Sequence, residues 1–263
     1  MTRQHSNIWS PRSAPQIERL VRLLRVSLAA IRGRIAGFKR CPIILLDIGA
    51  RGGLSRGWQT LWRLGLVTPV FVEPDPEEAA RLKANYKNAL VLQTAFGESK
   101  ETRTLYITKQ PGCSSLLRPR PSSKAPETFH SMCEVIKEID VEVEPASEVF
   151  HRLGIFPDVI KIDVQGFELA ILRGMGSFLA KASVIELEVS FISTYEDQPL
   201  IQDVVDFMVE QGFGLTDVSV FGVRGTGAAI QANALFGNRL NEGSRSSAIE
   251  DFATLATGKW YPV

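Results

Sequence analysis

Acidic side chains close two β-rich runs near the start of the chain. Asp47 ends the first run and is followed by the glycine-rich turn Gly49–Gly53, and Glu73 ends the second run. In a parallel sheet, ligands bind beyond the carboxyl ends of the strands, and glycines there let the backbone approach closely. A carboxylate at the first turn favours a cationic ligand group over a pyrophosphate, and one at the second can accept both hydrogen bonds of a ribose diol.

A third group of ionisable residues lies in the segment 158–168. Period-two alternation puts Lys161 and Asp163 on one face of a predicted strand. Charges on a strand that is buried on both faces require partners. Glu186 and Glu188 alternate in the same way on the next predicted strand. We therefore expect Lys161 to form an ion pair with one of these two glutamates, and Asp163, at the end of its strand, to contact a ligand.

The elements that would position these residues alternate between β-rich and helical runs from residue 41 onward. Asp75 and Pro76 supply an N-cap and a first-turn proline for one helix. The predicted strands are residues 42–48, 69–73, 90–95, 102–108, 158–164, 184–189, 213–218 and 232–236. The predicted helices are residues 54–64, 76–86, 144–153, 168–179 and 200–210. This alternation is typical of an α/β protein with helices on both faces of a mostly parallel sheet.

The two ends of the chain differ from its centre. Residues 1–40 carry nine Lys and Arg against one acid, Glu18, whereas the whole chain has a net charge of +1. Apolar residues at steps of three and four over 17–38 predict a basic amphipathic helix. This arm would pack on the domain or on a second subunit, or would lie on an anionic membrane surface. Residues 41–240 are expected to form one domain, and 241–263 a mobile tail.

Several functional classes are disfavoured by composition. The three cysteines lack CxxC spacing and the three histidines form no metal-binding pair, so the sequence predicts neither a disulfide framework nor a metal site. No apolar run is long enough to span a bilayer, and no signal peptide is recognisable. We expect a cytoplasmic protein, with peripheral contact at the inner membrane surface as a possible role of the arm. The acidic body disfavours nucleic acid as a partner.

Five spaced blocks together resemble the FkbM-type S-adenosylmethionine-dependent methyltransferases. They are ILLDIGARGG, VFVEPDP, TAFGE, CSSLL and DVIKIDVQGFELAILRGM, within a resemblance that runs over residues 43–236. The resemblance implies a Rossmann-like class I methyltransferase fold, with a seven-stranded, mostly parallel sheet whose last strand is antiparallel. It also implies S-adenosylmethionine as methyl donor and transfer to a hydroxyl oxygen of a sugar, glycan or natural-product acceptor.

The resemblance also assigns residues to parts of the cofactor. The residues that match its cofactor-binding blocks are Asp47, Gly49 and Gly52 for the methionine part, Glu73 for the ribose, and Ala95 and Phe96 near the adenine. For Phe96, packing in the core is the alternative role. Asp163 falls in the fourth-strand signature and would accept a hydrogen bond from the cofactor. The long insert 110–132 could form the acceptor-side wall.

The fourth-strand signature also holds the candidate bases. A placed carboxylate that removes a proton from an alcohol typically contributes about 10²- to 10⁴-fold. Asp163 is the first candidate base and Glu168 the second. The alternative role of Asp163 is a contact with the cofactor, and that of Glu168 is a favourable charge at a helix N-terminus. The family commonly has an acid where this chain has Gln165, and an amide cannot transfer a proton near neutral pH.

Two other hypotheses remain open at this point. Gln165 and the basic arm also fit a catalytically degenerate module that keeps the fold and binds a partner or a membrane surface through the arm. The retained Asp47, Glu73 and Asp163 favour an active enzyme over that alternative. A nicotinamide-dependent dehydrogenase is disfavoured, because the glycines after Asp47 do not follow GxGxxG spacing.

Overall fold

The computed structural model describes residues 35, 37–120, 125, 127–222, 229–241 and 243–257. The chain divides into two compact units, residues 1–42 and 43–263. Nearly all of the predicted amphipathic helix, residues 17–38, lies outside the described residues, so its proposed contacts with a membrane or subunit stay predictions. Within the described ranges, no helix combines the length and apolar character needed to cross a bilayer.

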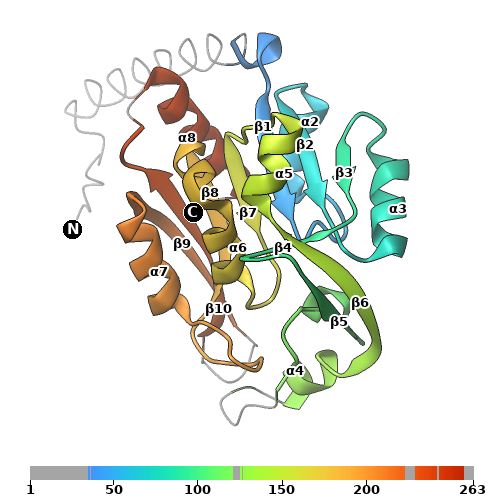
Figure 1. Ribbon diagram of the computed structural model, residues 1–263. Coiled ribbons are helices and arrows are strands. Elements are labelled where there is room, and N and C mark those ends of the chain that lie inside the picture. The colour runs from blue at the N-terminus through green and yellow to red at the C-terminus, as the bar shows by residue number, and fades with distance from the viewer. Residues whose placement is uncertain are drawn as a thin grey trace, which may run out of the picture. The chain divides into compact units, whose positions relative to one another are not determined.

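A seven-stranded sheet forms the centre of the second unit (Figure 1). Its strands, in spatial order, are β3 (Leu90–Leu92), β2 (Val67–Val72), β1 (Ile43–Ile48), β7 (Val159–Ile162), β8 (Val184–Ser190), β10 (Ala229–Asn238) and β9 (Phe213–Gly222). β1 runs parallel to β2 and β7, whereas β10 is antiparallel to both of its neighbours. The class I methyltransferase fold predicted from the sequence is confirmed. Strand order reverses at β1 and β7, which is where ligands bind in such sheets.

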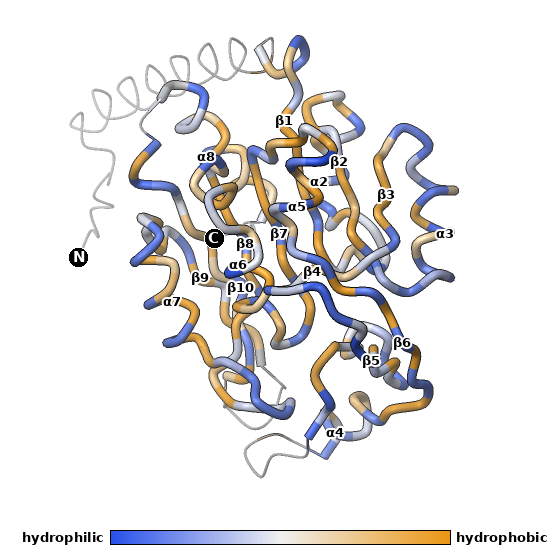
Figure 2. The backbone as a smooth tube through the Cα atoms, in the orientation of Figure 1, coloured by the Kyte–Doolittle hydropathy of each residue, from blue (hydrophilic) through white to orange (hydrophobic). Residues whose placement is uncertain are grey.

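Helices cover the sheet because its central strands are apolar on both faces (Figure 2). The helices of the second unit around this sheet are α2 (Arg56–Arg63), α3 (Pro76–Asn85), α5 (Ala146–Leu153), α6 (Glu168–Met175), α7 (Ile201–Glu210) and α8 (Ser244–Thr257), with a 3-10 turn at Gly176–Lys181. α6 packs against α5 and α7, and α2 packs against α8. The predicted cap of α3 is present, since the Asp75 carboxylate accepts a hydrogen bond from the Glu77 amide.

A second, three-stranded sheet was not expected from the sequence. Its order is β4 (Ala95–Gly97), β6 (Val135–Pro145) and β5 (Glu101–Thr108), and it has a small core of its own. The strand predicted at 90–95 is in fact two strands: β3 pairs with β2, and β4 pairs with β6. The long insert 110–132 contains a 3-10 turn, Pro111–Cys113, and α4 (Glu127–Met132), and β6 follows it.

The expected mobile tail is also corrected. Residues 244–257 form α8, in which Ala248, Ile249, Phe252 and Ala253 are buried. These residues recur at steps of three and four, so they form one apolar face. α8 packs closely on α2 at Gly57. A Cβ added at this glycine would lie 2.0 Å from the Ala256 carbonyl oxygen, so a larger residue would not fit there.

Candidate active site

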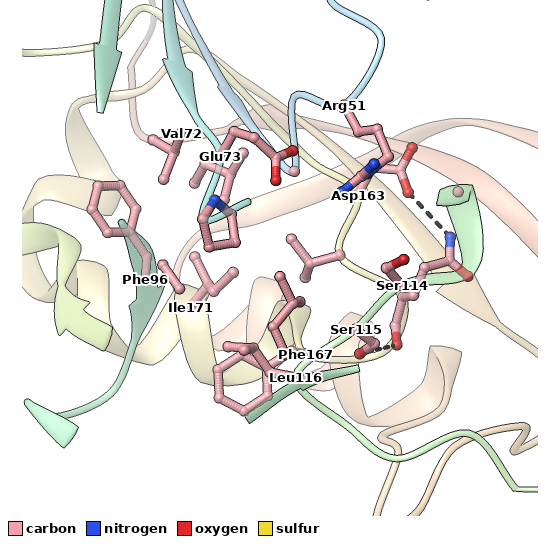
Figure 3. Close-up of a pocket in the computed structure, with 18 of the residues that line it drawn as sticks. Arg51, Val72, Glu73, Phe96, Ser114, Ser115, Leu116, Asp163, Phe167 and Ile171 are labelled. Carbon is pink, nitrogen blue, oxygen red and sulfur yellow. Dashed lines mark hydrogen bonds between the residues drawn. The ribbon is translucent and has the colours of Figure 1, made fainter. Parts of the chain in front are cut away.

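Two adjoining cavities lie at the carboxyl ends of the central strands. The first, of about 390 Å³, is bounded by the ends of β1 and β2, by β4, by the start of α6 and by the segment 110–116 (Figure 3). The second, of about 260 Å³, is lined by the turn after β1 and by β7, β8 and β10. The two differ in chemistry: the first is mainly apolar, and the second contains Asp163, Glu186 and Glu188. Arg51 and Asp163 line both cavities and therefore mark their junction.

The glycine-rich turn brings β1 against the end of β7. Gly49 has φ +75°, and a Cβ there would lie 2.0 Å from the carbonyl oxygen of Asp163, so only glycine fits. Gly49 lines the first cavity. Gly52 lines neither cavity formed by the described residues; its amide donates a 2.8 Å hydrogen bond to the Glu78 carboxylate. Its role is thus to hold the turn on α3.

Asp47 lies beneath this turn and is fully buried. Its Oδ1 accepts a 3.1 Å hydrogen bond from Lys161 Nζ, because the two residues are direct neighbours on β1 and β7. Its Oδ2 has no hydrogen-bond partner within the described residues. Asp47 lines neither cavity formed by these residues. The structure therefore places it behind the site, where it reaches the cavities through Lys161.

Lys161 corrects the ion pair expected from the sequence. Its Nζ lies 3.1 Å from Asp47 and 3.6 Å from Asp163, rather than pairing with either glutamate of β8. Burial alone would lower the pKa of Lys161, but the charges of Asp47, Asp163 and Glu186 raise it well above its usual range. A charged Lys161 thus joins the buried carboxylate of Asp47 to the carboxylate of Asp163, which faces the cavities.

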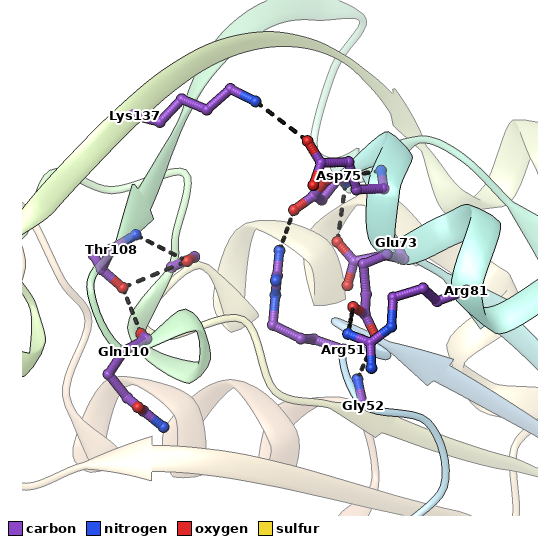
Figure 4. A network of polar contacts seen from close by, with 11 residues as sticks. Arg51, Gly52, Glu73, Asp75, Arg81, Thr108, Gln110 and Lys137 are labelled. Carbon is purple, nitrogen blue, oxygen red and sulfur yellow. Dashed lines mark hydrogen bonds and ion pairs between the residues drawn. The ribbon is translucent and has the colours of Figure 1, made fainter.

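Glu73 occupies the predicted position at the end of β2 and lines the first cavity. Its side chain is buried, and Oε1 accepts a 3.0 Å hydrogen bond from the Asp75 amide. Burial raises its pKa to about 7, although the Asp75 amide and Arg51 oppose this. Arg51 is held in turn by a 2.5 Å ion pair with Asp75 (Figure 4). A carboxyl group here can accept hydrogen bonds from a ligand diol.

The apolar cavity is built by residues of both sheets. Ala95 and Phe96, predicted near an adenine, lie on β4 and line it. Phe96 is also part of the core, since its ring makes an edge-to-face contact with Phe150 at 5.9 Å. The two roles weighed for Phe96 are therefore compatible. Phe167 and Leu105, which the sequence did not single out, complete the lining.

The segment 110–116 closes the apolar cavity on its remaining side. Thr108 Oγ1 donates to the Gln110 carbonyl at 2.6 Å (Figure 4), and Ser115 Oγ donates to the Gln165 carbonyl at 2.9 Å (Figure 3). These bonds fix the segment against the turn after β7. The sequence predicted an acceptor-side wall here, and the structure places its first residues opposite Phe96 and Glu73. The CSSLL block was the signal that marked this wall.

The two predicted bases have different surroundings. Asp163 has a side chain that is 36% exposed and lines both cavities. Glu168 is buried and lines neither of the cavities described here. Its Oε1 accepts hydrogen bonds from the amides of Val164, at 3.2 Å, and Gly166, at 3.1 Å. Burial raises the pKa of Glu168 to about 7. Glu168 therefore shapes the turn after β7, and Asp163 is the carboxylate that a ligand would meet.

This fold is that of the methyltransferase class predicted from the sequence. Residues 47–215 match the model of the methyltransferase FkbM domain. The chain belongs to that family. A comparison with curated protein sequences gave no significant match.

The chain is similar in structure to several solved methyltransferases. Magnesium protoporphyrin IX methyltransferase from Synechocystis PCC 6803, with bound SAM, is 12% identical, with 88% of this chain and 86% of that chain covered and a TM-score of 0.41. The 1,6-didemethyltoxoflavin-N1-methyltransferase from Burkholderia thailandensis is 12% identical, with 89% and 93% covered and a TM-score of 0.37.

Proposed function

We propose that this methyltransferase transfers a methyl group from S-adenosylmethionine to a hydroxyl oxygen of a sugar, glycan or natural-product acceptor. The observation that carries the proposal is the position of Asp163, whose carboxylate stands where the apolar and acidic cavities meet. A base at that junction would lie beside the middle of a donor that spans both cavities, where an acceptor hydroxyl has to approach the methyl group.

The two cavities fit the two halves of the donor. The first offers Phe96 and Phe167 to a purine ring and the Glu73 carboxyl to a ribose diol. The second presents Asp163, Glu186 and Glu188 to the positively charged methionine end. Behind that cavity, the buried Oδ2 of Asp47 has no hydrogen-bond partner among the described residues. When bound, S-adenosylmethionine supplies an electrophilic methyl group on a sulfonium that leaves readily.

The protein's task is to align the acceptor and to take its proton. Well-oriented groups can supply as much as about 7–11 kcal/mol of a barrier. Asp163 Oδ1 accepts a 3.2 Å hydrogen bond from Gln165 Nε2, and Oδ2 lies 3.6 Å from Lys161 Nζ. These two contacts hold the side chain of Asp163 in place, and a carboxylate there can accept a proton from a hydroxyl group.

The experiment uses S-adenosylmethionine with a labelled methyl group and panels of hydroxyl, amine and carboxylic acid acceptors. The proposal predicts a methyl ether, identified by the carbon shift of its methyl group in NMR spectra of the product. Methylation of nitrogen or of a carboxylate would overturn the assignment to oxygen. If the folded protein binds S-adenosylhomocysteine but transfers no label to any panel, the degenerate binding module becomes the better account.

A further inference from the structure

Gln165 lies two residues after Asp163, in the turn after β7, and it has an unusual backbone. Its φ is +60°, in the left-handed region that non-glycine residues rarely adopt. The residue is 7% exposed and sits directly before Gly166, whose φ is +105°. A strained conformation persists where surrounding contacts determine it. The side chain of Gln165 supplies those contacts.

The side-chain amide of Gln165 makes three hydrogen bonds. Its Nε2 donates to Asp163 Oδ1 at 3.2 Å and to Glu188 Oε1. Its Oε1 accepts from Gln231 Nε2 at 3.2 Å and lies 3.3 Å from Tyr195 Oη, whose single hydrogen is donated to the Cys113 carbonyl at 2.8 Å. Both donor hydrogens of the amide are therefore used. Figure 3 shows the bond to Asp163 together with the serine contact to the Gln165 backbone.

The two donor bonds join the acids that line the acidic cavity. Asp163 lies at the end of β7 and Glu188 on β8, and a single amide nitrogen contacts both. Gln231 donates a second hydrogen bond, of 2.5 Å, to Glu188 from β10. Burial raises the pKa of Glu188 to about 9, and the charge of Asp163 adds to this effect. A carboxyl group in place of the Gln165 amide would face both acids and could donate at most one hydrogen.

The charged and titratable groups around this amide come from several elements. They are Lys161 on β7, Asp163 directly after β7, Glu168 on α6, Glu186 and Glu188 on β8, Arg51 in the turn after β1, and Tyr195 before α7. Four of these seven groups are carboxyls. An additional negative charge at position 165 would therefore raise the pKa values of its acidic neighbours and strengthen the attraction for a cation.

We propose that Gln165 is a positioning residue whose amide joins Asp163 to Glu188 and keeps a further acid out of the group formed by Asp163, Glu168, Glu186 and Glu188. It thereby sets how strongly the acidic cavity prefers a sulfonium ligand over a neutral thioether. The inference rests on the proposed function, because the two ligands are S-adenosylmethionine and its demethylated product. In this account the amide limits the charge of the cavity and fixes the orientation of Asp163.

The test is calorimetric binding of S-adenosylmethionine and S-adenosylhomocysteine to the wild type and to Gln165→Glu. A unit charge at about 8 Å and an effective dielectric of about 40 changes binding by roughly fivefold. The new carboxyl shares the burial and the acidic neighbours that raise the pKa of Glu188 to about 9, so it ionises only as the pH approaches that value. Between pH 7 and pH 9.5 we expect the dissociation constant of S-adenosylhomocysteine, divided by that of S-adenosylmethionine, to rise at least about fivefold in the variant relative to the wild type. An unchanged ratio across this range would overturn the inference.

A second variant separates the amide from the backbone strain. Gln165→Gly removes the side chain, and glycine adopts φ +60° without strain. The melting temperature of this variant should therefore stay close to that of the wild type. Its binding of S-adenosylhomocysteine should be at least about threefold weaker. Asp197→Gly is the matched control, because Asp197 is exposed and has φ +52°; it should bind the ligand as the wild type does. Wild-type affinity in Gln165→Gly would contradict a positioning role. If the wild type itself binds neither ligand, the proposed function fails as well.

Discussion

The two cavities at the sheet edge share Arg51 and Asp163 but are built from different parts of the molecule. The apolar one needs both sheets, since β4 and the segment 110–116 close it over the ends of β1 and β2. The acidic one lies against the central sheet alone, with Asp163 directly after β7 and Glu186 and Glu188 on β8. Burying several carboxyl groups together is costly unless cations compensate for them. Lys161 and Arg51 line this cavity as cations, and the raised pKa of Glu188 reduces its negative charge further, so the difference in charge between the two cavities is set mainly by a few groups.

The largest effect is expected from Asp163→Asn, which removes the base at the junction. Methyl transfer should fall by about 10²- to 10⁴-fold, because general base catalysis by a carboxylate is lost. Initial rates at saturating donor measure this effect. Binding constants measured in parallel should show S-adenosylmethionine weakened more than S-adenosylhomocysteine, because only the former is a sulfonium cation. A variant that retains a tenth or more of wild-type activity would remove Asp163 from the catalytic role.

Glu168→Gln should change the pH dependence of stability. The pKa of Glu168 is about 7 in the folded protein against an ordinary value of 4.5. The unfolded chain therefore releases this proton first as the pH rises, and the stability contribution present below pH 4.5 is lost by about pH 7. The shift corresponds to about 3 kcal/mol. Denaturant unfolding between pH 4.5 and 8 should show the variant gaining stability relative to the wild type by about that amount.

The same substitution distinguishes the two predicted bases. Gln can still accept the hydrogen bonds of the Val164 and Gly166 amides, so the turn is expected to survive. Methyl transfer should fall much less in Glu168→Gln than in Asp163→Asn. Equal losses in both variants would show that Glu168 also takes part in proton transfer.

Glu73→Gln tests the apolar cavity separately. A hydrogen bond to a charged group contributes about 1.5–3 kcal/mol, and 1.4 kcal/mol corresponds to a tenfold change in affinity. We expect S-adenosylmethionine and S-adenosylhomocysteine to be weakened by the same factor of about ten, since the ribose is identical in both. Calorimetry with each ligand measures this. A selective loss of the sulfonium would mean that Glu73 belongs to the charged end of the site.

The smallest effect is expected from Ile249→Val in α8. Ile249 is buried, and removing one methylene from such a site typically costs about 0.5–1.5 kcal/mol. The free energy of unfolding should fall by that amount, while binding of S-adenosylhomocysteine is unchanged. Lys83→Ala, on α3, serves as a surface control with little effect. No loss of stability in the α8 variant would indicate that this helix does not pack as described.

Much of the central sheet could be predicted because each strand is a short apolar run bounded by turn residues. The positions of Gly49, Glu73 and Asp163 followed from the rule that loops after parallel strands meet at one edge. Their placement against the cavities agrees with that expectation. The family resemblance added Ala95 and Phe96, whose contact with the first cavity no periodicity would have indicated.

The remaining errors have identifiable physical causes. In β6, Ile139, Val141 and Val143 alternate with acids, which is a strand pattern that the high charge of the segment obscured. The break between β3 and β4 depends on pairing with β2 and β6, which are distant in sequence. The partner of Lys161 depended on the register of β1 with β7, and alternation along one strand does not specify which neighbouring strand supplies the partner.

The central claim is that the two cavities together hold an adenosyl sulfonium donor or its product. The most direct measurement is the melting temperature of the purified protein with and without S-adenosylhomocysteine. At 100 times the dissociation constant the ligand should add about 2.7 kcal/mol, which is roughly 5–10 °C for a domain of this size. The shift should shrink in Glu73→Ala at the same ligand concentration. No shift at millimolar ligand, in a wild-type protein shown to be folded, would contradict the account.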